Sequence, residues 1–267
     1  MSTGKPAPRE SVIILQSLVM PTLPMATQYP QSPSTPRAGS HHSLPPSAIN
    51  RRSILLAGSL LALGGTSSAR AQSPSSHRHH FKDADHWAKV FDDPKRDAWQ
   101  RPHEVIQALA LPPDAVVADI GAGTGYFALR LSHMLPQGRV YAIDAEPAMA
   151  RHLAERARQE QRTNLTAVIA SPDDPKLPAP IDLALLVNVY HHIGARVAYF
   201  RRLRGSLKPK GRVAILDFTP DSPDGPPRSA RVPAEQVIAE MKQAGYRVLR
   251  EHRFLPQQFF IEFEVAG

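Results

Sequence analysis

The 267-residue sequence contains no cysteine. This absence excludes disulfides, thiolate metal sites, iron–sulfur clusters and cysteine nucleophiles, but it does not identify the redox compartment. No uninterrupted apolar run reaches the roughly 18 residues of a spanning helix, which excludes a multi-pass membrane protein. Because 42% of the residues are hydrophobic, the chain can still bury a sizeable core.

Acidic residues are scarce only at the N-terminal end. The formal net charge is +8, and residues 1–71 carry six basic groups and one acid, which leaves a charge of only +3 for the other 196 residues. A basic patch that follows a nucleic-acid backbone needs a much larger excess than this. We therefore expect no nucleic-acid partner.

The first 49 residues contain nine of the 27 prolines, together with many serines. Such a segment buries too little apolar surface to offset its ordering entropy, so we expect a disordered leader over residues 1–49. A different pattern follows in residues 50–71, where Arg51 and Arg52 precede an apolar run that ends near Gly65.

Residues 50–71 end in Ala69-Arg70-Ala71, a small-x-small cleavage site. Charged, apolar and small residues in this order are typical of an export signal, and the paired arginines resemble the twin-arginine type. We expect cleavage after Ala71, a linker over residues 72–85, a periplasmic location, and membrane contact only through the signal. The alternatives are a buried N-terminal helix, a retained membrane anchor, or a cytoplasmic protein.

Apolar strands alternate with amphipathic helices through the rest of the chain. The expected strands are residues 116–120, 139–144, 165–170, 181–187, 212–217, 246–254 and 258–265, and the longer helices are 126–135, 147–160, 197–207 and 234–244. Short helical pieces precede them from Trp87, divided by Pro94 and Pro102. Strands that are apolar throughout indicate a parallel sheet covered on both faces, and the short connection before residue 258 indicates an antiparallel hairpin. We predict a single doubly wound, Rossmann-like α/β domain over residues 86–267, with a mainly parallel seven-stranded sheet and a C-terminal antiparallel hairpin.

A glycine loop follows the first expected strand. Gly121, Gly123 and Gly125 form a G-x-G-x-G pattern, and Asp119 precedes it. A dinucleotide site expects G-x-G-x-x-G and a P-loop expects G-K-[ST], so the spacing disfavours a nicotinamide oxidoreductase and excludes a P-loop. Asp144 ends the second strand, nineteen residues after Gly125. Its carboxylate there can accept both hydroxyls of a ribose, or it can cap the next helix.

The loop and Asp144 together resemble the class I S-adenosylmethionine-dependent methyltransferases, and the resemblance covers roughly residues 86–267. It implies S-adenosyl-L-methionine as cofactor, with Asp119 close to the amino group of its methionine moiety and Asp144 on the ribose. It also implies that an acidic side chain after the third strand, Asp173 or Asp174, accepts from the adenine amino group, although either aspartate can instead serve a surface turn. The implied cofactor-binding residues are Asp119, Gly121, Ala122, Gly123, Thr124, Gly125, Tyr126, Asp144, Ala145, Asp173, Asp174 and Asn188.

The segment Asn188–Ile193 follows the fourth strand. It resembles the subgroup that contains ubiquinone/menaquinone C-methyltransferases, and it differs from the N-P-P-Y form that marks amino-group methylation of nucleic acids or protein glutamine. The resemblance implies that Asn188 and Tyr190 border the transferable methyl group. We take Tyr190, His191 and His192 as catalytic candidates, with one histidine as a general base near neutral pH. The alternative is that one histidine caps a helix and the other packs.

We therefore expect a methyltransferase that moves a methyl group to a small-molecule acceptor by in-line displacement. We expect it to be metal-independent, because no histidine and carboxylate cluster has metal-site spacing. The acceptor would contact the segment from Trp87 to Gln100 and the loop 219–233, although aromatic side chains at helical spacing more often belong to a core. The alternative function is a non-catalytic exported protein that binds S-adenosylmethionine or S-adenosylhomocysteine.

Overall fold

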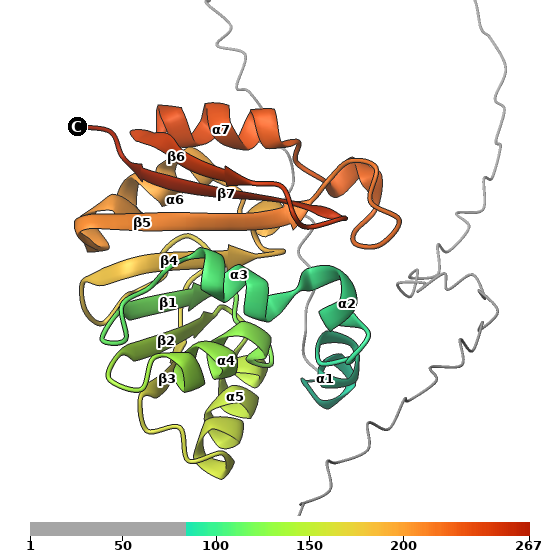
Figure 1. The fold of residues 1–267 in the computed structure, drawn as a ribbon, viewed down its shortest axis with the longest axis vertical. Helices are drawn as coiled ribbons and strands as arrows, with labels where there is room; N and C mark the ends of the chain where they lie inside the picture. Colours follow the sequence, from blue (N-terminus) through green and yellow to red (C-terminus); the bar gives the residue numbers. More distant parts are fainter. Residues whose placement is uncertain (1–83) are drawn as a thin grey trace, which may run out of the picture. The chain divides into compact units, whose positions relative to one another are not determined.

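A computed structural model describes residues 84–267 (Figure 1). The leader, the export signal and nearly all of the linker that we predicted lie outside these residues. The described part contains one seven-stranded sheet in the order β3-β2-β1-β4-β5-β7-β6. The strands are β1 (Val116–Ile120), β2 (Arg139–Asp144), β3 (Leu165–Ile169), β4 (Ile181–Val187), β5 (Leu207–Phe218), β6 (Tyr246–His252) and β7 (Gln258–Val265).

The pairing of the strands confirms the predicted fold class. β3, β2, β1, β4 and β5 are parallel neighbours, and β7 pairs antiparallel with both β5 and β6. Because β6 and β7 are antiparallel, the short connection between them is long enough to join them, and no crossover helix is needed.

Seven α-helices accompany the strands in residues 84–267. They are α1 (Ala84–Phe91), α2 (Arg96–Gln100), α3 (Pro102–Ala108), α4 (Tyr126–Met134), α5 (Pro147–Gln159), α6 (Arg196–Leu203) and α7 (Ala234–Gln243). Single 3₁₀ turns occur at η1 (Tyr190–His192), η2 (Arg204–Ser206) and η3 (Arg228–Ala230). None of the helices in this part of the chain is long and apolar enough to cross a membrane.

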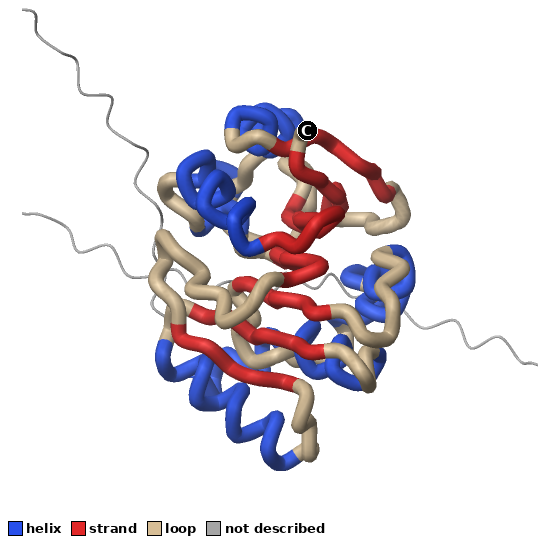
Figure 2. Tube along the Cα trace, turned by 90° about the vertical axis from the view of Figure 1, so that its left-hand side faces the viewer, coloured by secondary structure: helices blue, strands red, loops and turns tan. Residues whose placement is uncertain are grey.

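The alternation of side chains along each strand divides the core into two layers, one on each face of the sheet. Figure 2 shows helices on both sides of the strands. Successive side chains of a strand point to opposite faces of a sheet. Val117 thus packs with α3, α4 and α5, whereas the next residue, Ala118, packs with α6 and α7. Both faces are covered, which explains why the parallel strands are apolar throughout.

The structure corrects two expected boundaries. α6 ends at Leu203 rather than 207, and β5 begins at Leu207 rather than 212. Leu207 pairs with Ile181, and the register then shifts before Arg212 pairs with Leu183, so residues 208–211, which lay between the expected helix and strand, form an irregularity within the strand. Lys208 binds Asp182 across this irregularity, with 2.8 Å between Nζ and Oδ2.

A buried ion cluster ties the antiparallel hairpin to the rest of the sheet. Glu262 on β7 is fully buried, and its carboxylate accepts from Arg212 of β5 at 2.6 Å and contacts His252 of β6 at 2.8 Å. Arg212 also donates to the carbonyl oxygen of Leu109 at 2.5 Å. One carboxylate therefore links three strands and the end of α3, and it retains charged partners that offset its desolvation.

We expect Glu262→Ala to lower the free energy of unfolding by about 3–5 kcal/mol, because it leaves the partly buried guanidinium of Arg212 without its carboxylate. Urea denaturation measures this change. Glu264→Ala on the same strand is the matched control, since Glu264 pairs with the largely exposed Arg247 and such pairs contribute about 0–1 kcal/mol. Equal losses in the two variants would contradict the central role of Glu262.

Candidate active site

The glycine loop lies across the carboxyl end of β2. The backbone N–H groups of Gly121 and Ala122 both donate to the carbonyl oxygen of Ile143, at 2.7 and 3.0 Å. The next N–H, of Gly123, donates to Oδ2 of Asp144 at 2.8 Å. Three successive amides thus fix the loop between β1 and α4, at the edge where parallel α/β sheets bind their ligands.

Two of the glycines are required by their conformation and by their neighbours. Gly121 has φ +73°, and a Cβ atom there would come within 2.3 Å of Cγ2 of Val189. Gly125 has φ +97°, and its Cβ would lie 2.1 Å from Cδ1 of Leu153. L-residues with side chains rarely adopt such φ values, so the sequence pattern at these positions reflects the path of the backbone.

Asp144 joins the loop to the start of α5. Its Oδ1 accepts from the backbone N–H of Glu146 at 2.9 Å, while its Oδ2 holds Gly123. The helix-cap alternative is only partly met, because α5 begins at Pro147 and Glu146 occupies the N-cap position. Burial raises the pKa of the Asp144 carboxyl, and the backbone N–H groups of Glu146 and Gly123 oppose that shift.

Asp119 is a buried acid of the site, with 3% of its surface exposed. Its Oδ2 atom has no hydrogen-bond partner within residues 84–267. Burial raises the pKa of the Asp119 carboxyl to about 7, the N–H of Ala128 and the charge of Arg96 lower it, and the charge of Asp144 raises it. A buried carboxylate with an unused oxygen is able to receive a cationic donor.

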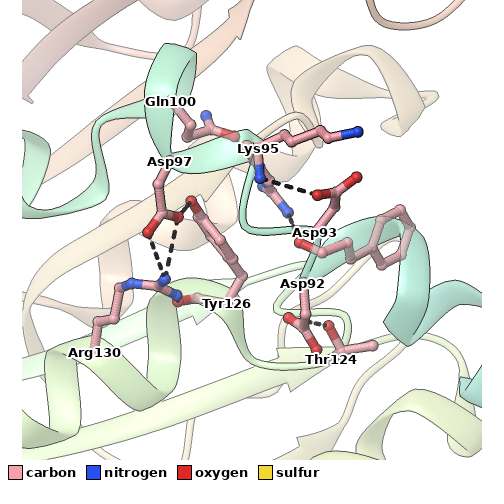
Figure 3. A network of polar contacts seen from close by, with 10 residues as sticks. Asp92, Asp93, Lys95, Asp97, Gln100, Thr124, Tyr126 and Arg130 are labelled. Carbon is pink, nitrogen blue, oxygen red and sulfur yellow. Dashed lines mark hydrogen bonds and ion pairs between the residues drawn. The ribbon is translucent and has the colours of Figure 1, made fainter. Parts of the chain in front are cut away.

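The segment of α1 and α2 covers the glycine loop (Figure 3). Asp92, after α1, accepts from the Thr124 hydroxyl at 3.1 Å and pairs with Arg156 of α5 at 2.6 Å. Asp97 of α2 accepts from the Tyr126 hydroxyl and pairs with Arg130 at 3.2 Å. Both aspartates come from the N-terminal segment and hold loop residues, so this segment forms one wall of the site.

Three amide side chains connect this wall with the carboxyl ends of β4 and β5. Gln100, which is fully buried in α2, donates to Gln258 at the start of β7, and Gln258 donates to Oδ1 of Asn188. Asn188 follows β4 and has φ +59°, a left-handed conformation that asparagine tolerates better than most residues. The sequence suggested Gln100 and Asn188, but it contained no signal for Gln258.

His191 and Asp217 form a buried pair at the ends of β4 and β5. Nδ1 of His191 lies 2.9 Å from both carboxylate oxygens of Asp217, and only 5% of the histidine side chain is exposed. Asp217 also accepts from the backbone N–H groups of His191 and Phe218, at 3.2 and 2.8 Å. A carboxylate on Nδ1 fixes the ring and leaves Nε2 for a proton, which is the arrangement of a general base.

The structure distinguishes the other two catalytic candidates from His191. Tyr190 is fully buried, its hydroxyl donates to Glu240 of α7 at 2.6 Å, and its ring stacks on Phe200. We expected it to border a methyl group at the strand edge, but the structure places it in the packing between the sheet and α7. His192 is partly exposed, and the centroid of its ring lies 4.1 Å from the ring centroid of His191.

Three predicted residues remain. Ala145 follows β2, and Asp173 and Asp174 lie in the loop after β3. Ala145 is exposed beside Asp144. Asp174 accepts from the backbone N–H of Lys176 at 2.9 Å within a tight turn, as the surface-turn alternative expects. Asp173 is exposed, and its carbonyl oxygen accepts from Arg202. Of the two, only Asp174 uses its carboxylate in this turn, and the role of either on adenine stays a prediction.

Sequence reasoning missed Asp217, Gln258 and the aspartates of the N-terminal segment. Asp217 stood at the end of an expected parallel strand, next to the fourth strand, and that position was a usable signal. The prediction of metal independence stays a prediction. Within residues 84–267, no group of three or more histidine or acidic side chains is arranged to hold a metal ion.

Comparisons with known proteins match this part of the chain to methyltransferases. Residues 118–213 match the family model described as a methyltransferase domain. A protein-L-isoaspartate O-methyltransferase of Aeropyrum pernix is 29% identical over 158 residues, covering 54% of this chain and 57% of the relative. A malonyl-[acyl-carrier protein] O-methyltransferase of Legionella pneumophila is 26% identical and covers 54% of this chain and 48% of the relative. The chain thus spans about half the length of these curated relatives.

A solved structure covers more of the domain. A SAM-dependent methyltransferase of Aquifex aeolicus has a TM-score of 0.64 and 25% identity, and it matches 69% of this chain and 99% of its own. The magnesium protoporphyrin IX methyltransferase of Synechocystis PCC 6803, solved with bound SAM, shares the fold with a TM-score of 0.54 and 16% identity, over 70% and 93% of the two chains. These findings support a class I S-adenosylmethionine-dependent methyltransferase and confirm the expected cofactor.

The described residues fit this cofactor. The positive φ angles of Gly121, Gly123 and Gly125 set the path of the loop between Asp119 and α4, beside Asp144. The unused oxygen of Asp119 suits an ammonium group, and Asp144 stands where a ribose would meet the end of β2. The finer assignments to the ubiquinone/menaquinone subgroup and to a twin-arginine signal stay predictions.

We expect Asp119→Asn to stabilise the ligand-free protein at alkaline pH. The pKa of Asp119 is raised in the fold, so its contribution to stability is fully present below about pH 4 and is lost as the pH rises through about 7. Asparagine carries no charge, and above pH 8 the variant should unfold with a free energy about 1–3 kcal/mol higher than the wild type. Denaturation at pH 4.5 and pH 8.5 measures this difference, and equal variant effects at both values would refute the assignment.

Proposed function

We propose that this protein is an S-adenosylmethionine-dependent methyltransferase that acts on a small-molecule acceptor by in-line displacement and without a metal ion. The observation that carries this proposal is the glycine loop, which three successive amides hold on the end of β2 beside Asp119 and Asp144. The cofactor class follows from the comparisons, whereas the acceptor class is our proposal.

The chain's own residues divide the work of binding. Asp144 would accept the ribose hydroxyls, since a carboxylate accepts two hydroxyl hydrogen bonds at once. The glycine loop would line the methionine moiety, and Asp119 would receive its ammonium group. The bound cofactor supplies a methyl group on a positively charged sulfur, and the carbon of this methyl group is already electrophilic. The protein therefore has to align the acceptor and exclude water, an orientation effect that contributes several kcal/mol, up to about 7–11.

His191 and Asp217 add proton transfer to this alignment. Nε2 of His191 would take the proton that a hydroxyl or carbon acceptor loses as its new bond to the methyl carbon forms. Asp217 would hold the ring through Nδ1 and stabilise the imidazolium. The Asp217 carboxylate is itself fixed, because it accepts hydrogen bonds from the backbone N–H groups of His191 and Phe218. This pair favours an acceptor with an ionisable proton.

A rigid loop supports a small acceptor. The guanidinium of Arg231 donates to the carbonyl oxygens of Thr219, Pro220, Ser222, Asp224 and Pro226, at 2.7–3.2 Å. The loop between β5 and α7 is therefore fixed from within, and Phe218 at its start contacts Trp99 of α2 with 5.7 Å between ring centroids. Trp99 and Phe218 thus bring the N-terminal segment and this loop together at the end of β5.

We also propose that the protein is exported. The support is sequence alone, namely the paired Arg51 and Arg52, the following apolar run and the small-x-small site before residue 72. Replacing both arginines by lysine should retain the protein in the cytoplasm, as fractionation with an antibody would show. Unchanged export of the double variant would contradict the twin-arginine assignment.

Calorimetric titration of S-adenosylmethionine into the full chain tests the cofactor assignment, and we expect Asp144→Ala to weaken binding by at least tenfold. The variant removes a charged acceptor worth about 1.5–3 kcal/mol and also releases Gly123. Glu155→Gln is the matched control, because Glu155 lies exposed on α5 and, within residues 84–267, accepts hydrogen bonds from its helix neighbours Arg158 and Gln159. Absence of saturable binding by the folded wild type would refute the proposed function.

Release of S-adenosylhomocysteine with a panel of phenols, carboxylates, amines and carbon acids tests the acceptor class. His191→Asn should lower kcat on hydroxyl or carbon acceptors by about 10²–10⁴, and Asp217→Asn should lower it too, because the wrong imidazole tautomer is then favoured. Cofactor affinity should stay within about threefold of the wild type in both variants. Undiminished turnover in His191→Asn would exclude this histidine as the base.

A further inference from the structure

The side-chain amides of Gln100, Gln258 and Asn188 form one hydrogen-bonded row, here called the amide row. Nε2 of Gln100 donates to Oε1 of Gln258, and Nε2 of Gln258 donates to Oδ1 of Asn188. At the other end of the row, Nε of Arg96 donates to Oε1 of Gln100 at 2.7 Å. The amide row therefore runs from α2, through the start of β7, to the residue that follows β4.

The chemistry of Arg96 sets the direction of every bond in the amide row. A guanidinium carries N–H donors and no acceptor, so the oxygen of the Gln100 amide has to face it. The NH2 group of Gln100 then faces Gln258, and the NH2 group of Gln258 in turn faces Asn188. Reversing one amide would place two donors or two oxygens against each other, and Gln100 and Gln258 are buried, where unpaired polar groups are costly.

The direction of the amide row leaves the donors of Asn188 for a ligand. Within residues 84–267, the hydrogen bond of the Asn188 side chain is the one that its Oδ1 accepts from Gln258, so its NH2 group keeps both donors. Asn188 is partly exposed, unlike the two glutamines, and this end of the row is therefore accessible.

Asn188 lies between the glycine loop and the pair of His191 and Asp217. The next residue, Val189, lies against the loop, because a Cβ atom at Gly121 would come within 2.3 Å of its Cγ2. Two residues further along the chain, Nδ1 of His191 contacts Asp217 at 2.9 Å. A molecule placed between the loop and His191 would therefore lie beside Asn188.

We propose, on the basis of the proposed function, that the NH2 group of Asn188 donates to an oxygen atom of the methyl acceptor. The acceptor would then carry a carboxylate, carbonyl or phenolate oxygen beside the atom that is methylated. An ammonium group has donors only and would face the donors of Asn188, so the amide row selects against cationic amines. Gln100 and Gln258 are positioning residues in this assignment, because they hold the Asn188 amide in its orientation.

Side-chain hydrogen exchange tests the orientation without any acceptor. The full chain is isotopically labelled on nitrogen, and the exchange of its side-chain NH2 groups with water is followed by NMR, with and without S-adenosylhomocysteine. We expect the NH2 groups of Gln100 and Gln258 to exchange at least about tenfold more slowly than that of Asn188, because theirs are held in buried hydrogen bonds. An Asn188 NH2 group as protected as that of Gln258 would overturn the assignment.

Two probes that share a phenol test the ligand class. Salicylate carries a carboxylate beside its hydroxyl, and 2-hydroxybenzylamine carries an ammonium on the same side. Each is titrated into the complex with S-adenosylhomocysteine, and we expect salicylate to shift the Asn188 NH2 resonance and to bind roughly 10- to 100-fold more tightly. Equal shifts with both probes, or no shift with salicylate, would overturn the assignment. A folded wild type that does not bind S-adenosylhomocysteine refutes the proposed function instead, so the two failures are distinguishable.

Two variants of Asn188 separate its donors from its charge. Asn188→Asp still accepts from Gln258 and suits the left-handed backbone at φ +59°, but an oxygen replaces the two donors. Asn188→Gly suits the same backbone and removes the donors without adding charge. Both should lower the preference for salicylate by roughly 10-fold or more, whereas Gln107→Glu, which adds a charge on the exposed face of α3, should retain it. A preference that survives in Asn188→Gly, or falls equally in Gln107→Glu, would overturn the assignment.

Gln258→Met tests the positioning role, because it breaks the amide row without touching the acceptor. The Asn188 amide is then free to turn, so the preference for salicylate should fall by roughly 3- to 10-fold while 2-hydroxybenzylamine binds as before. A purely structural role would weaken both probes equally, and that result would overturn the positioning role. Should this variant fail to fold, as its thermal melt would show, the Asn188 variants still decide the assignment.

Discussion

The structure of the site depends on where β2 ends. The carbonyl oxygen of Ile143 and the carboxylate of Asp144 receive three successive amides of the glycine loop, so the loop is an extension of the sheet rather than a free connection. Because β2 lies between β1 and β3, its position is fixed by parallel pairing on both sides. The hydrogen bonds to β2 therefore make the loop rigid. A rigid loop does not lose conformational entropy when its amides and the neighbouring acids bind a ligand.

Much of the fold could be predicted because the central strands are buried on both faces. Residues 116–120, 139–144 and 181–187 were identified with the bounds that the structure shows, since a short, mostly apolar run that ends at a glycine, an aspartate or an asparagine has few alternatives there. The start of β5 was missed. Pairing of Leu207 with Ile181 extends the strand across Pro209 and Gly211, and such long-range pairing outweighs the local turn signal.

The site could be predicted only where its residues are close in sequence to a strand end. Asp119, Asp144 and Asn188 follow this rule, and they lie at the carboxyl edge of the sheet. Gln258 and Asp92 act through contacts with residues 70 and 32 positions away, for which one sequence contains no pattern. Tyr190 is the reverse case, a residue that the sequence suggested for the site but that packs elsewhere. A tyrosine hydroxyl after a strand can also donate to a carboxylate in the packing, and here it donates to Glu240.

Asp119 and His191 illustrate two ways in which this fold treats a buried ionisable group. His191 has a carboxylate within 2.9 Å and is fixed by it, so its environment is complete without a ligand. Asp119 has an oxygen with no partner in the described part of the chain, and its ionisation is costly until a cation arrives.

This contrast implies that the two ends of the site have different energetics. At the ends of β4 and β5 the buried pair already has its hydrogen bonds, whereas at the end of β1 a buried acid keeps one oxygen without a partner in the described part of the chain. Arg96 of α2 lowers the pKa of the Asp119 carboxyl, so the packing of α2 over the glycine loop also affects the ionisation of this buried acid.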